Sequence, residues 1–417
     1  MGALVTCGDM RAHLADMEPD SVDAVICDPP YELGFMGRKW DSSGVAFDPA
    51  TWAAALRVAK PGSHLAAFGG SRTWHRIAVA IEDAGWVMRD SLIWWYAQGF
   101  PKSLDVSKAI DAAAGAEREI VGPGATNCSG LKSVGVCSCE SKNSQSSDTR
   151  HVFATAPATD AARKWAGWGT ALKPAFEPII LARKPLAGTV AANVLSYGTG
   201  AINVDGCRVG TSKRVPSTPR TAPQGAAFGD LSGADGSTGG FDPNIGRWPP
   251  NMLVSHADDC VEGAPCVEGC PAPMFGERLS TFPAFYAPKA SRSEREAGCE
   301  ALSARVVDES REEGAAGRDS PRAGAGRAGE PRRNIHPTVK PISIMRWLSR
   351  LLCAPGGLIL DPFAGSGTTG CAAVLEGFDF LGVELDPAHV AIAAARIAHH
   401  SRRTPPVQTQ TNLFEVA

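Results

Sequence analysis

The sequence lacks three features that would each point to a particular class of protein. It has no apolar run of the roughly 18 residues that a membrane-spanning helix needs. It does not open with a basic segment followed by an apolar stretch, so no secretory signal is visible, and we expect a cytoplasmic protein without membrane contact. It also lacks a charge excess, because the formal net charge is only −3. Any contact with nucleic acid therefore has to come from local basic surface.

Cysteine, by contrast, is abundant, with 12 in 417 residues. In a reducing compartment disulfides are disfavoured, and clustered thiols more often bind metal. The tightest cluster combines His256 with Cys260, Cys266 and Cys270, which are residue types that tetrahedral zinc binds. The Cys-x5-Cys-x3-Cys spacing is not a standard paired-knuckle spacing. Two interpretations therefore stay open, a structural zinc ion or free thiols in a loop.

Both ends of the chain read as regular α/β structure. Apolar runs and periodicity predict strands at residues 4–6, 22–27, 65–68, 92–96, 178–182, 358–360 and 380–384. They predict helices at residues 10–17, 73–84, 344–352 and 387–399, and a further helix that follows the glycine-rich segment 364–370 and ends at residue 375. Strands that alternate with helices predict a doubly wound, mostly parallel sheet that is covered on both faces. Three segments between the ends, residues 114–147, 211–246 and 300–333, have few large apolar side chains. We interpret them as flexible loops.

The first chemical motif is Asp28-Pro29-Pro30-Tyr31, directly after the buried strand predicted at residues 22–27. Two prolines stop the strand and prevent an immediate helix. The motif therefore lies stiffly at the carboxyl end of a parallel sheet, where ligands bind in such folds. It presents a carboxylate, backbone carbonyls and an aromatic ring, which suit the N–H donors and flat face of a base amine. The alternative is an ordinary turn, since Asp and Pro favour turns.

The second motif, Asp-Pro-Phe-Ala-Gly-Ser-Gly-Thr-Thr-Gly at residues 361–370, also follows a strand and opens a helix. Its glycines let the backbone approach a ligand closely. Gly365, Gly367 and Gly370 also fit the dinucleotide fingerprint, so an NAD-dependent oxidoreductase is a competing interpretation. Glu384, at the end of the next strand, could bind ribose hydroxyls in either case. The Asp-Pro-Phe lead-in and the lack of a nearby hydride-transfer motif disfavour the oxidoreductase.

Together the two motifs resemble those of the β-class amino-group DNA methyltransferases, in which the catalytic motif precedes the cofactor motif and the target-recognition region lies between them. Three further matches follow the family order at both ends of the chain. They are Gly8-Asp9, Lys173-Pro174 with Glu177-Pro178, and His-Pro-Thr-Val-Lys-Pro at residues 336–341. The middle of the chain shows only a general likeness.

The resemblance implies a circularly permuted, seven-stranded Rossmann-like sheet with a large inserted region. It divides the chain into residues 1–98 with the catalytic motif, 99–333 for target recognition with a late catalytic-domain strand near 174–184, 334–402 with the cofactor motif, and a tail at 403–417. The strand before Asp361 would then lie beside the strand before Asp28, and residues 4–6 would supply a strand that the C-terminal part lacks.

The resemblance also assigns site residues. Asp28, Pro29, Pro30 and Tyr31 are expected to be catalytic. S-adenosylmethionine is expected to contact Asp9, Thr338, Lys340, Asp361, Phe363, Ala364, Gly365, Ser366, Gly367 and Glu384. Lys289, Ser291 and Arg292 belong to a basic and aromatic segment that is expected to contact DNA.

The implied activity is site-specific methylation of adenine N6 in double-stranded DNA, by base flipping and direct transfer. A cytosine-N4 enzyme is the alternative, although the family's N4 enzymes more often begin the catalytic motif with serine. Pro265-Cys266-Val267 lies outside a strand-end context, which argues against a cytosine-C5 enzyme with a cysteine nucleophile. A non-catalytic DNA-binding subunit of a restriction system is a further alternative. A cognate restriction enzyme, and a monomer or a homodimer, are left open.

Overall fold

In the computed structural model, the described residues are 2–33, 39–96, 103–123, 153–209, 246–257, 260, 264–267, 270, 272–285, 290–305 and 331–402. The chain forms two compact units, one of residues 1–98, 175–301 and 336–417, the other of residues 99–174 and 302–335. Residues 175–301, predicted as part of the inserted region, thus belong to the unit that contains the sheet. The target-recognition role of residues 99–333 stays a prediction.

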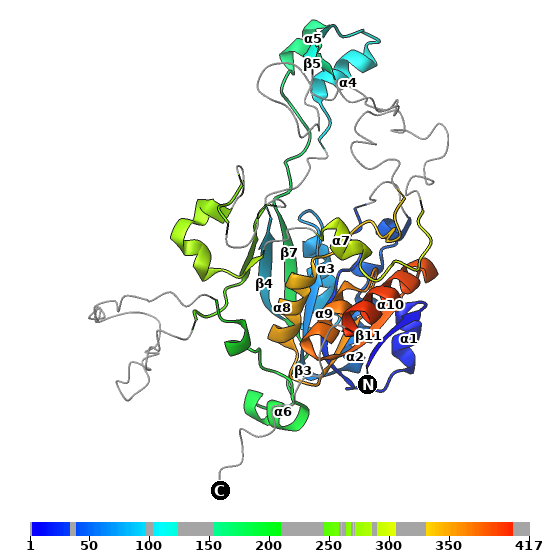
Figure 1. Ribbon diagram of the computed structural model, residues 1–417, viewed down its shortest axis with the longest axis vertical. Helices are drawn as coiled ribbons and strands as arrows, with labels where there is room; N and C mark the ends of the chain where they lie inside the picture. Colours follow the sequence, from blue (N-terminus) through cyan, green and yellow to red (C-terminus); the bar gives the residue numbers. More distant parts are fainter. Residues whose placement is uncertain are drawn as a thin grey trace, which may run out of the picture. The chain divides into compact units, whose positions relative to one another are not determined.

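The first unit is built on a nine-stranded sheet (Figure 1). Its strands, in spatial order, are β1 (Ala3–Cys7), β11 (Asp379–Glu384), β10 (Leu358–Asp361), β2 (Val22–Cys27), β3 (Ala59–Phe68), β7 (Phe176–Arg183), β4 (Val87–Trp95), β8 (Met252–Ser255) and β9 (Ala284–Phe285). Only β7 runs antiparallel to its neighbours. The predicted doubly wound, mostly parallel sheet is confirmed. It exceeds the seven predicted strands by β8 and β9, which have only four and two residues and so carry no readable periodicity.

The sheet joins the two ends of the chain as the permuted order requires. Leu4 of β1 pairs with Leu381 of β11, and Leu360 of β10 pairs with Val25 of β2. From β10 the chain winds towards β11, whereas from β2 it winds towards β3. The boundary between β10 and β2 is therefore the switch point at which ligands bind in such folds.

Helices cover both faces of the sheet. One face packs against α8 (Ile342–Leu352), α9 (Thr368–Glu376) and α10 (Pro387–Ser401), drawn in orange to red in Figure 1. The other face packs against α1 (Met10–Asp16), α2 (Pro49–Val58) and α3 (Trp74–Asp83). The residues between the layers are almost all apolar and fully buried. Their removal from water is the main term that stabilises the fold.

Local sequence fixes where several helices begin. In α10 the Asp386 carboxylate accepts a hydrogen bond from the Ala388 N–H, and Pro387 occupies the first turn, as predicted. The same Asp-Pro pair begins α2, where Asp48 accepts from the Ala50 N–H. This helix was missed in the sequence, although it has the same start signal. The first unit also contains α6 (Val190–Tyr197), α7 (Arg292–Glu296) and 3-10 helices at Lys39–Ser42, Val45–Phe47, Asp205–Cys207 and Ala272–Thr281.

The second unit contains α4 (Val106–Ala113), β5 (Ile120–Pro123), β6 (Phe153–Thr155) and α5 (Asp160–Lys164). The buried Asp111 carboxylate holds it together. It accepts hydrogen bonds from Arg118 Nη1 at 2.6 Å and from the Thr159 hydroxyl at 2.8 Å. The predicted loops at residues 114–147, 211–246 and 300–333 lie largely outside the described residues. Among the described helices, none is both long and apolar enough to cross a membrane.

Candidate active site at the carboxyl ends of four strands

Four neighbouring parallel strands each have an acidic residue at, or just after, their carboxyl end. Asp9 follows β1, Glu384 ends β11, Asp361 ends β10 and Asp28 follows β2. Parallel strands end at the same edge of a sheet, so the order of these strands places the four acids along one edge. The structure thus brings together residues 28–31 and 361–367, which are far apart in sequence.

The Asp28 carboxylate is held by a lysine from the other end of the chain. Lys340 Nζ donates a hydrogen bond to Asp28 Oδ2 at 2.6 Å and also lies 3.4 Å from Glu177 Oε2. The second Asp28 oxygen, Oδ1, is buried and has no hydrogen-bond partner among the described residues. A buried carboxylate oxygen without a donor is costly. The site therefore holds an acceptor that a ligand N–H group could satisfy.

The charges of this cluster do not balance within it, because two carboxylates face one ammonium group. Burial raises the pKa of Asp28, the charge of Lys340 counteracts this, and Glu177 reinforces it. Burial alone would lower the pKa of Lys340, but the charges of Asp28 and Glu177 outweigh it and raise that pKa. Lys340 is therefore charged at neutral pH, and its charge favours the ionised form of Asp28.

Tyr31 is fixed at its hydroxyl and at its backbone. Its hydroxyl donates to Glu177 Oε2 at 2.8 Å, and its carbonyl accepts from the Thr73 hydroxyl at 2.7 Å. Lys340 Nζ lies 5.2 Å from the centre of the Tyr31 ring, which is within reach of a cation–π contact. Burial, followed by the charges of Asp28 and Glu177, raises the pKa of Tyr31 well above its usual value, so the phenol is neutral. The structure thus presents an oriented, uncharged ring beside Asp28.

Glu177 joins these groups, and the sequence did not single it out as a site residue. It lies on β7 near Asp28. It accepts hydrogen bonds from the hydroxyls of two tyrosines, Tyr31 and, at 3.4 Å, Tyr96. Its only signal in the sequence was Glu177-Pro178 as a family match. An acid at the start of an otherwise apolar strand could have marked it as a buried, paired group.

The glycine-rich loop after β10 is held from three sides. Gly365 N–H donates to Glu384 Oε2 at 2.8 Å, and Ala364 N–H donates to the Val383 carbonyl at 2.9 Å. The fully buried Arg396 of α10 donates from Nη1 to the Ser366 carbonyl at 2.6 Å. Arg396 was missed in the sequence, because the alanine-rich helix gave no reason to bury a charge.

Asp361 begins this loop and is almost fully buried. Its oxygens accept hydrogen bonds from the Phe363 N–H at 3.0 Å and from the Thr369 hydroxyl at 2.5 Å. Burial raises the pKa of Asp361 to about 7, although these hydrogen bonds counteract it. Burial would also raise the pKa of Glu384, but hydrogen bonds from His389 and from the Asp386 and Gly365 N–H groups outweigh it and lower the pKa. An anionic Glu384 beside a glycine loop fits the hydroxyl donors of a ribose.

Two loop glycines adopt a conformation that other residues disfavour. Gly365 has φ 52° and Gly367 has φ 74°. A Cβ atom on Gly365 would lie 2.8 Å from His336 Nε2, and one on Gly367 would lie 2.8 Å from the Ala393 Cβ. A side chain at either position would therefore fit only by displacing α10 or His336, and the loop leads directly into the amino end of α9, where helix N–H groups point outward. This cradle and the acids around it fit a nucleoside with a charged amino-acid arm.

We expect Gly367→Ala to destabilise the protein and to weaken nucleoside binding. Gly356→Ala is a matched control, because Gly356 has φ 75° but a Cβ atom there would meet nothing within 4 Å. The control should lose about 1 kcal/mol from backbone strain alone. Gly367→Ala should lose about 1–3 kcal/mol more, because the methyl group overpacks against α10. Thermal unfolding measures the difference, and equal losses in the two variants would contradict this packing.

The remaining predicted residues have diverse surroundings. Asp9 is exposed and caps α1 by accepting from the Arg11 N–H at 2.8 Å, while the Gly8 N–H before it donates to the Glu384 carbonyl at 2.9 Å. Phe363 lies against Trp52, with ring centres 6.1 Å apart. Pro29 is buried, and Pro30 is half-buried. Thr338 is exposed, and the structure places Lys340 against Asp28.

The predicted DNA-contacting residues are only partly described. Ser291 is exposed and caps α7, where its hydroxyl accepts from the Glu294 N–H at 3.1 Å. Arg292 is exposed at the first position of that helix. Lys289 lies outside the described residues. A role of this segment in DNA binding therefore stays a prediction.

Comparison with known proteins gives matches at the sequence and at the fold level. Residues 292–395 match a family model described as DNA methylase, N6_N4_Mtase. The DNA adenine methyltransferase YhdJ of Escherichia coli (strain K12) is 32% identical over 93 residues, which are 19% of this chain and 32% of that protein. The chain thus spans about a third of the length of that curated relative.

Two solved structures align over most of the chain at low identity. A putative DNA modification methylase from Thermus thermophilus, solved with S-adenosyl-L-methionine, has 16% identity and a TM-score of 0.39, over 96% of this chain and 95% of that one. The PvuII DNA methyltransferase (cytosine-N4-specific) has 12% identity and a TM-score of 0.43, over 97% and 92%. The matched segment, residues 292–395, contains Lys340 and the whole glycine-rich loop. Residues 292–395 are therefore similar to the DNA methylase family that this model, N6_N4_Mtase, describes.

Proposed function

We propose that this protein is a DNA methyltransferase that moves a methyl group from S-adenosylmethionine to the N6 amino group of adenine in double-stranded DNA. One observation carries the proposal. The Asp28 motif and the Asp361 loop lie at the ends of the adjacent strands β2 and β10, at the switch point of one sheet. A methyl donor and a methyl acceptor have to meet in such a place, because direct transfer needs the two reacting atoms in contact.

The glycine loop and its neighbours are proposed to hold the donor. The loop backbone, Asp361 and Glu384 would hold the amino-acid arm and the ribose, and Asp9 would lie beside the adenine ring. S-adenosylmethionine, when bound, supplies a methyl group on a positively charged sulfur atom. Anionic Glu384 gives this edge of the sheet a negative potential that suits such a cation.

The Asp28 motif is proposed to hold the acceptor amine. Asp28 Oδ1, buried and without a partner among the described residues, accepts a hydrogen bond from the amine. The Pro29 carbonyl accepts the second N–H. These acceptors draw density towards the nitrogen and orient its lone pair for attack on the methyl group, while Asp28 stabilises the positive charge that develops on the amine. The proton that the methylated amine loses then passes to solvent.

Tyr31 is proposed to stack on the target base. Lys340 lies over the Tyr31 ring, and the Tyr31 hydroxyl is bonded to Glu177, so the ring is held in one orientation before the base arrives. The amine of a paired and stacked base is unreachable for Asp28, which is attached to the rim of a sheet. The target nucleotide must therefore rotate out of the duplex, which costs a few kcal/mol that stacking on Tyr31 partly offsets.

Adenine is the proposed target for two reasons. The catalytic motif begins with Asp rather than Ser, and the E. coli relative is a DNA adenine methyltransferase. Site-specificity, a cognate restriction enzyme and a cytoplasmic location belong to the same proposal. The alternative target, cytosine N4, presents an amine of similar geometry, so the same acceptor atoms would serve it.

Methyl transfer to DNA tests the proposal directly. Purified protein is incubated with S-adenosylmethionine that carries a tritiated methyl group and with duplex DNA of mixed sequence. The DNA is then digested, and its nucleosides are separated. We expect label in N6-methyladenine, and sequencing of the methylated DNA would identify the site. Label in N4-methylcytosine would overturn the choice of base, and unlabelled DNA across varied sequences would overturn the proposed activity.

A further inference from the structure

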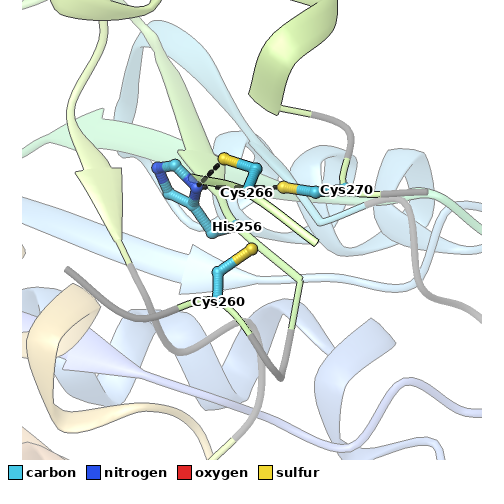
Figure 2. A group of neighbouring side chains, drawn as sticks. All are labelled: His256, Cys260, Cys266 and Cys270. Carbon is cyan, nitrogen blue, oxygen red and sulfur yellow. Dashed lines mark hydrogen bonds between the residues drawn. The ribbon is translucent and has the colours of Figure 1, made fainter. Parts of the chain in front are cut away.

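The His256 cluster, which consists of His256, Cys260, Cys266 and Cys270, has no role in the proposed reaction. In Figure 2 the imidazole and the three sulfur atoms point towards one another from separate turns of the chain. Each residue offers one ligand atom, and these four atoms lie within 4.8 Å of one another. His256, Cys260 and Cys270 are buried, and Cys266 is half-buried. Four potential metal ligands from a stretch of 15 residues thus lie around one point.

The distances fit a tetrahedral ion. Cys266 Sγ lies 3.3 Å and Cys270 Sγ lies 3.8 Å from His256 Nδ1. Zinc with Zn–S bonds of about 2.3 Å and Zn–N bonds of about 2.0–2.1 Å holds its sulfur and nitrogen ligands about 3.6 Å apart, and two sulfurs about 3.8 Å apart. The two sulfur–nitrogen distances, 3.3 Å and 3.8 Å, lie on either side of the expected separation of about 3.6 Å. A contraction of about 1 Å at the widest pair would complete the tetrahedron.

The cluster is attached to the sheet through His256. His256 directly follows β8, and its N–H donates to the Phe285 carbonyl of β9 at 2.7 Å. Cys270 lies just before the 3-10 helix Ala272–Thr281, and the Ala257 N–H donates to its sulfur at 3.4 Å. An N–H group directed at sulfur stabilises a thiolate, which is the form that binds metal. His256 is therefore anchored to the sheet, and Cys270 is held by the backbone next to His256.

Among the described residues, the apolar cluster around the cysteines is small. It consists mainly of Ala257 and Ala272, with Val267 and Leu279 partly buried, and the aromatic contact of this segment with β4 lies farther along, at Phe275 against Trp95. Such a core contributes little to stability, because buried apolar area sets the hydrophobic term. A bound ion is the usual substitute in a segment that cannot build a core.

We propose that His256, Cys260, Cys266 and Cys270 bind one structural zinc ion that fastens the segment between β8 and β9 to the edge of the sheet. Four protein ligands complete the tetrahedron and leave no position for water or substrate, so the ion does not take part in catalysis. Binding displaces the remaining thiol protons to solvent. Three cysteines and a histidine select zinc over magnesium or calcium, which prefer oxygen ligands.

The position of the site gives it a structural consequence. Ser255, the residue before His256, accepts a hydrogen bond from Trp94 Nε1 of β4 at 3.0 Å. Tyr96, which follows β4, packs against Trp94 with ring centres 5.0 Å apart and reaches Glu177. The segment that would hold the zinc therefore continues the sheet outward from β4, the strand that leads to Tyr96 and its contact with Glu177. Loss of the ion should loosen β8 and β9 first.

Metal content is measured on the full chain, expressed with zinc in the medium and purified without chelator. We expect about one zinc ion per chain in the wild type and in the control Cys7→Ser, whose cysteine is exposed and outside the cluster. Cys266→Ser and His256→Ala should each lose most of the bound zinc. A wild type with only traces of zinc, a stoichiometric amount of another metal, or full zinc in both cluster variants would overturn the proposal.

X-ray absorption at the zinc edge keeps the test valid where a variant fails to fold, because it uses the wild type alone. We expect three sulfur neighbours at about 2.3 Å and one nitrogen neighbour at about 2.0–2.1 Å. A shell of oxygen and nitrogen atoms would mean an adventitious ion and would contradict this site. Replacement of zinc by cobalt gives a second readout, since tetrahedral thiolate ligation has strong visible absorption and octahedral binding does not.

Discussion

Asp28→Ala is expected to lose methyl transfer to DNA while it still binds S-adenosylmethionine. The substitution removes the acceptor for the amine, and the loss of one such electrostatic contact typically costs roughly 100- to 1000-fold in kcat. Cofactor affinity should stay near the wild-type value, because the glycine loop is held by Glu384, Val383 and Arg396. Tritiated methyl incorporation measures the first effect, and calorimetric titration with S-adenosylmethionine measures the second.

Asp23→Ala is a matched control for this variant. Asp23 is also an acid of β2 that is paired with a lysine, with Lys60 Nζ at 2.5 Å, but it lies at the start of the strand and not at its carboxyl end. The control should lose stability and retain kcat in the folded fraction. Wild-type activity in Asp28→Ala would contradict the proposed role of the carboxylate. So would an equal fall of kcat in the two variants.

Lys340→Met is expected to lower both the stability and the activity near neutral pH. It leaves the half-buried Asp28 and Glu177 without their cation; breaking a fully buried pair costs about 3–5 kcal/mol, and partial exposure makes the loss smaller here. Burial already raises the pKa of Asp28, and Lys340 counteracts that rise, so its loss raises the pKa further. Because only ionised Asp28 is a full acceptor for its amine hydrogen bond, the acid side of the pH–rate profile should move to higher pH.

Two further variants separate charge from folding. In Lys340→Met with Glu177→Gln, the charge of Glu177 is removed with that of the lysine, so stability should partly return. The pH shift should be smaller than in Lys340→Met alone, because the charge of Glu177 also raises the pKa of Asp28. Lys60→Met is the control for loss of a paired lysine elsewhere on the sheet, and its profile should match the wild type. A profile of Lys340→Met that keeps its acid side in place would contradict the coupling between Lys340 and Asp28.

Much of the sheet could be predicted because its strands are short apolar runs that end in conspicuous residues. Val22–Cys27 was predicted with the observed bounds, since an Asp-Pro-Pro segment follows it. Two strands were missed for a different reason. Met252–Ser255 and Ala284–Phe285 are defined by pairing with neighbours and not by a pattern of their own, since Ser255 is buried as the acceptor of Trp94. Tertiary context therefore decides such strands.

The site was predicted motif by motif, whereas its connections were not. Lys340 was assigned to the cofactor from the match at residues 336–341. Its ion pair with Asp28 spans 312 positions, and no local pattern encodes such a contact. Glu177 was missed as a site residue for the same reason, because it gains its role only when β7 inserts between β3 and β4. Local patterns thus predicted the groups that we propose to react, and the fold showed which other groups contact them.

A crystal structure of the chain with S-adenosylhomocysteine would test the central claim most directly. That claim is that the strand ends at Asp28 and Asp361 form one reaction site. We expect the ribose beside Glu384, the amino-acid arm along residues 361–367, and the sulfur atom on the side that faces residues 28–31. A ligand bound elsewhere, or bound with its sulfur turned away from Asp28, would contradict the account.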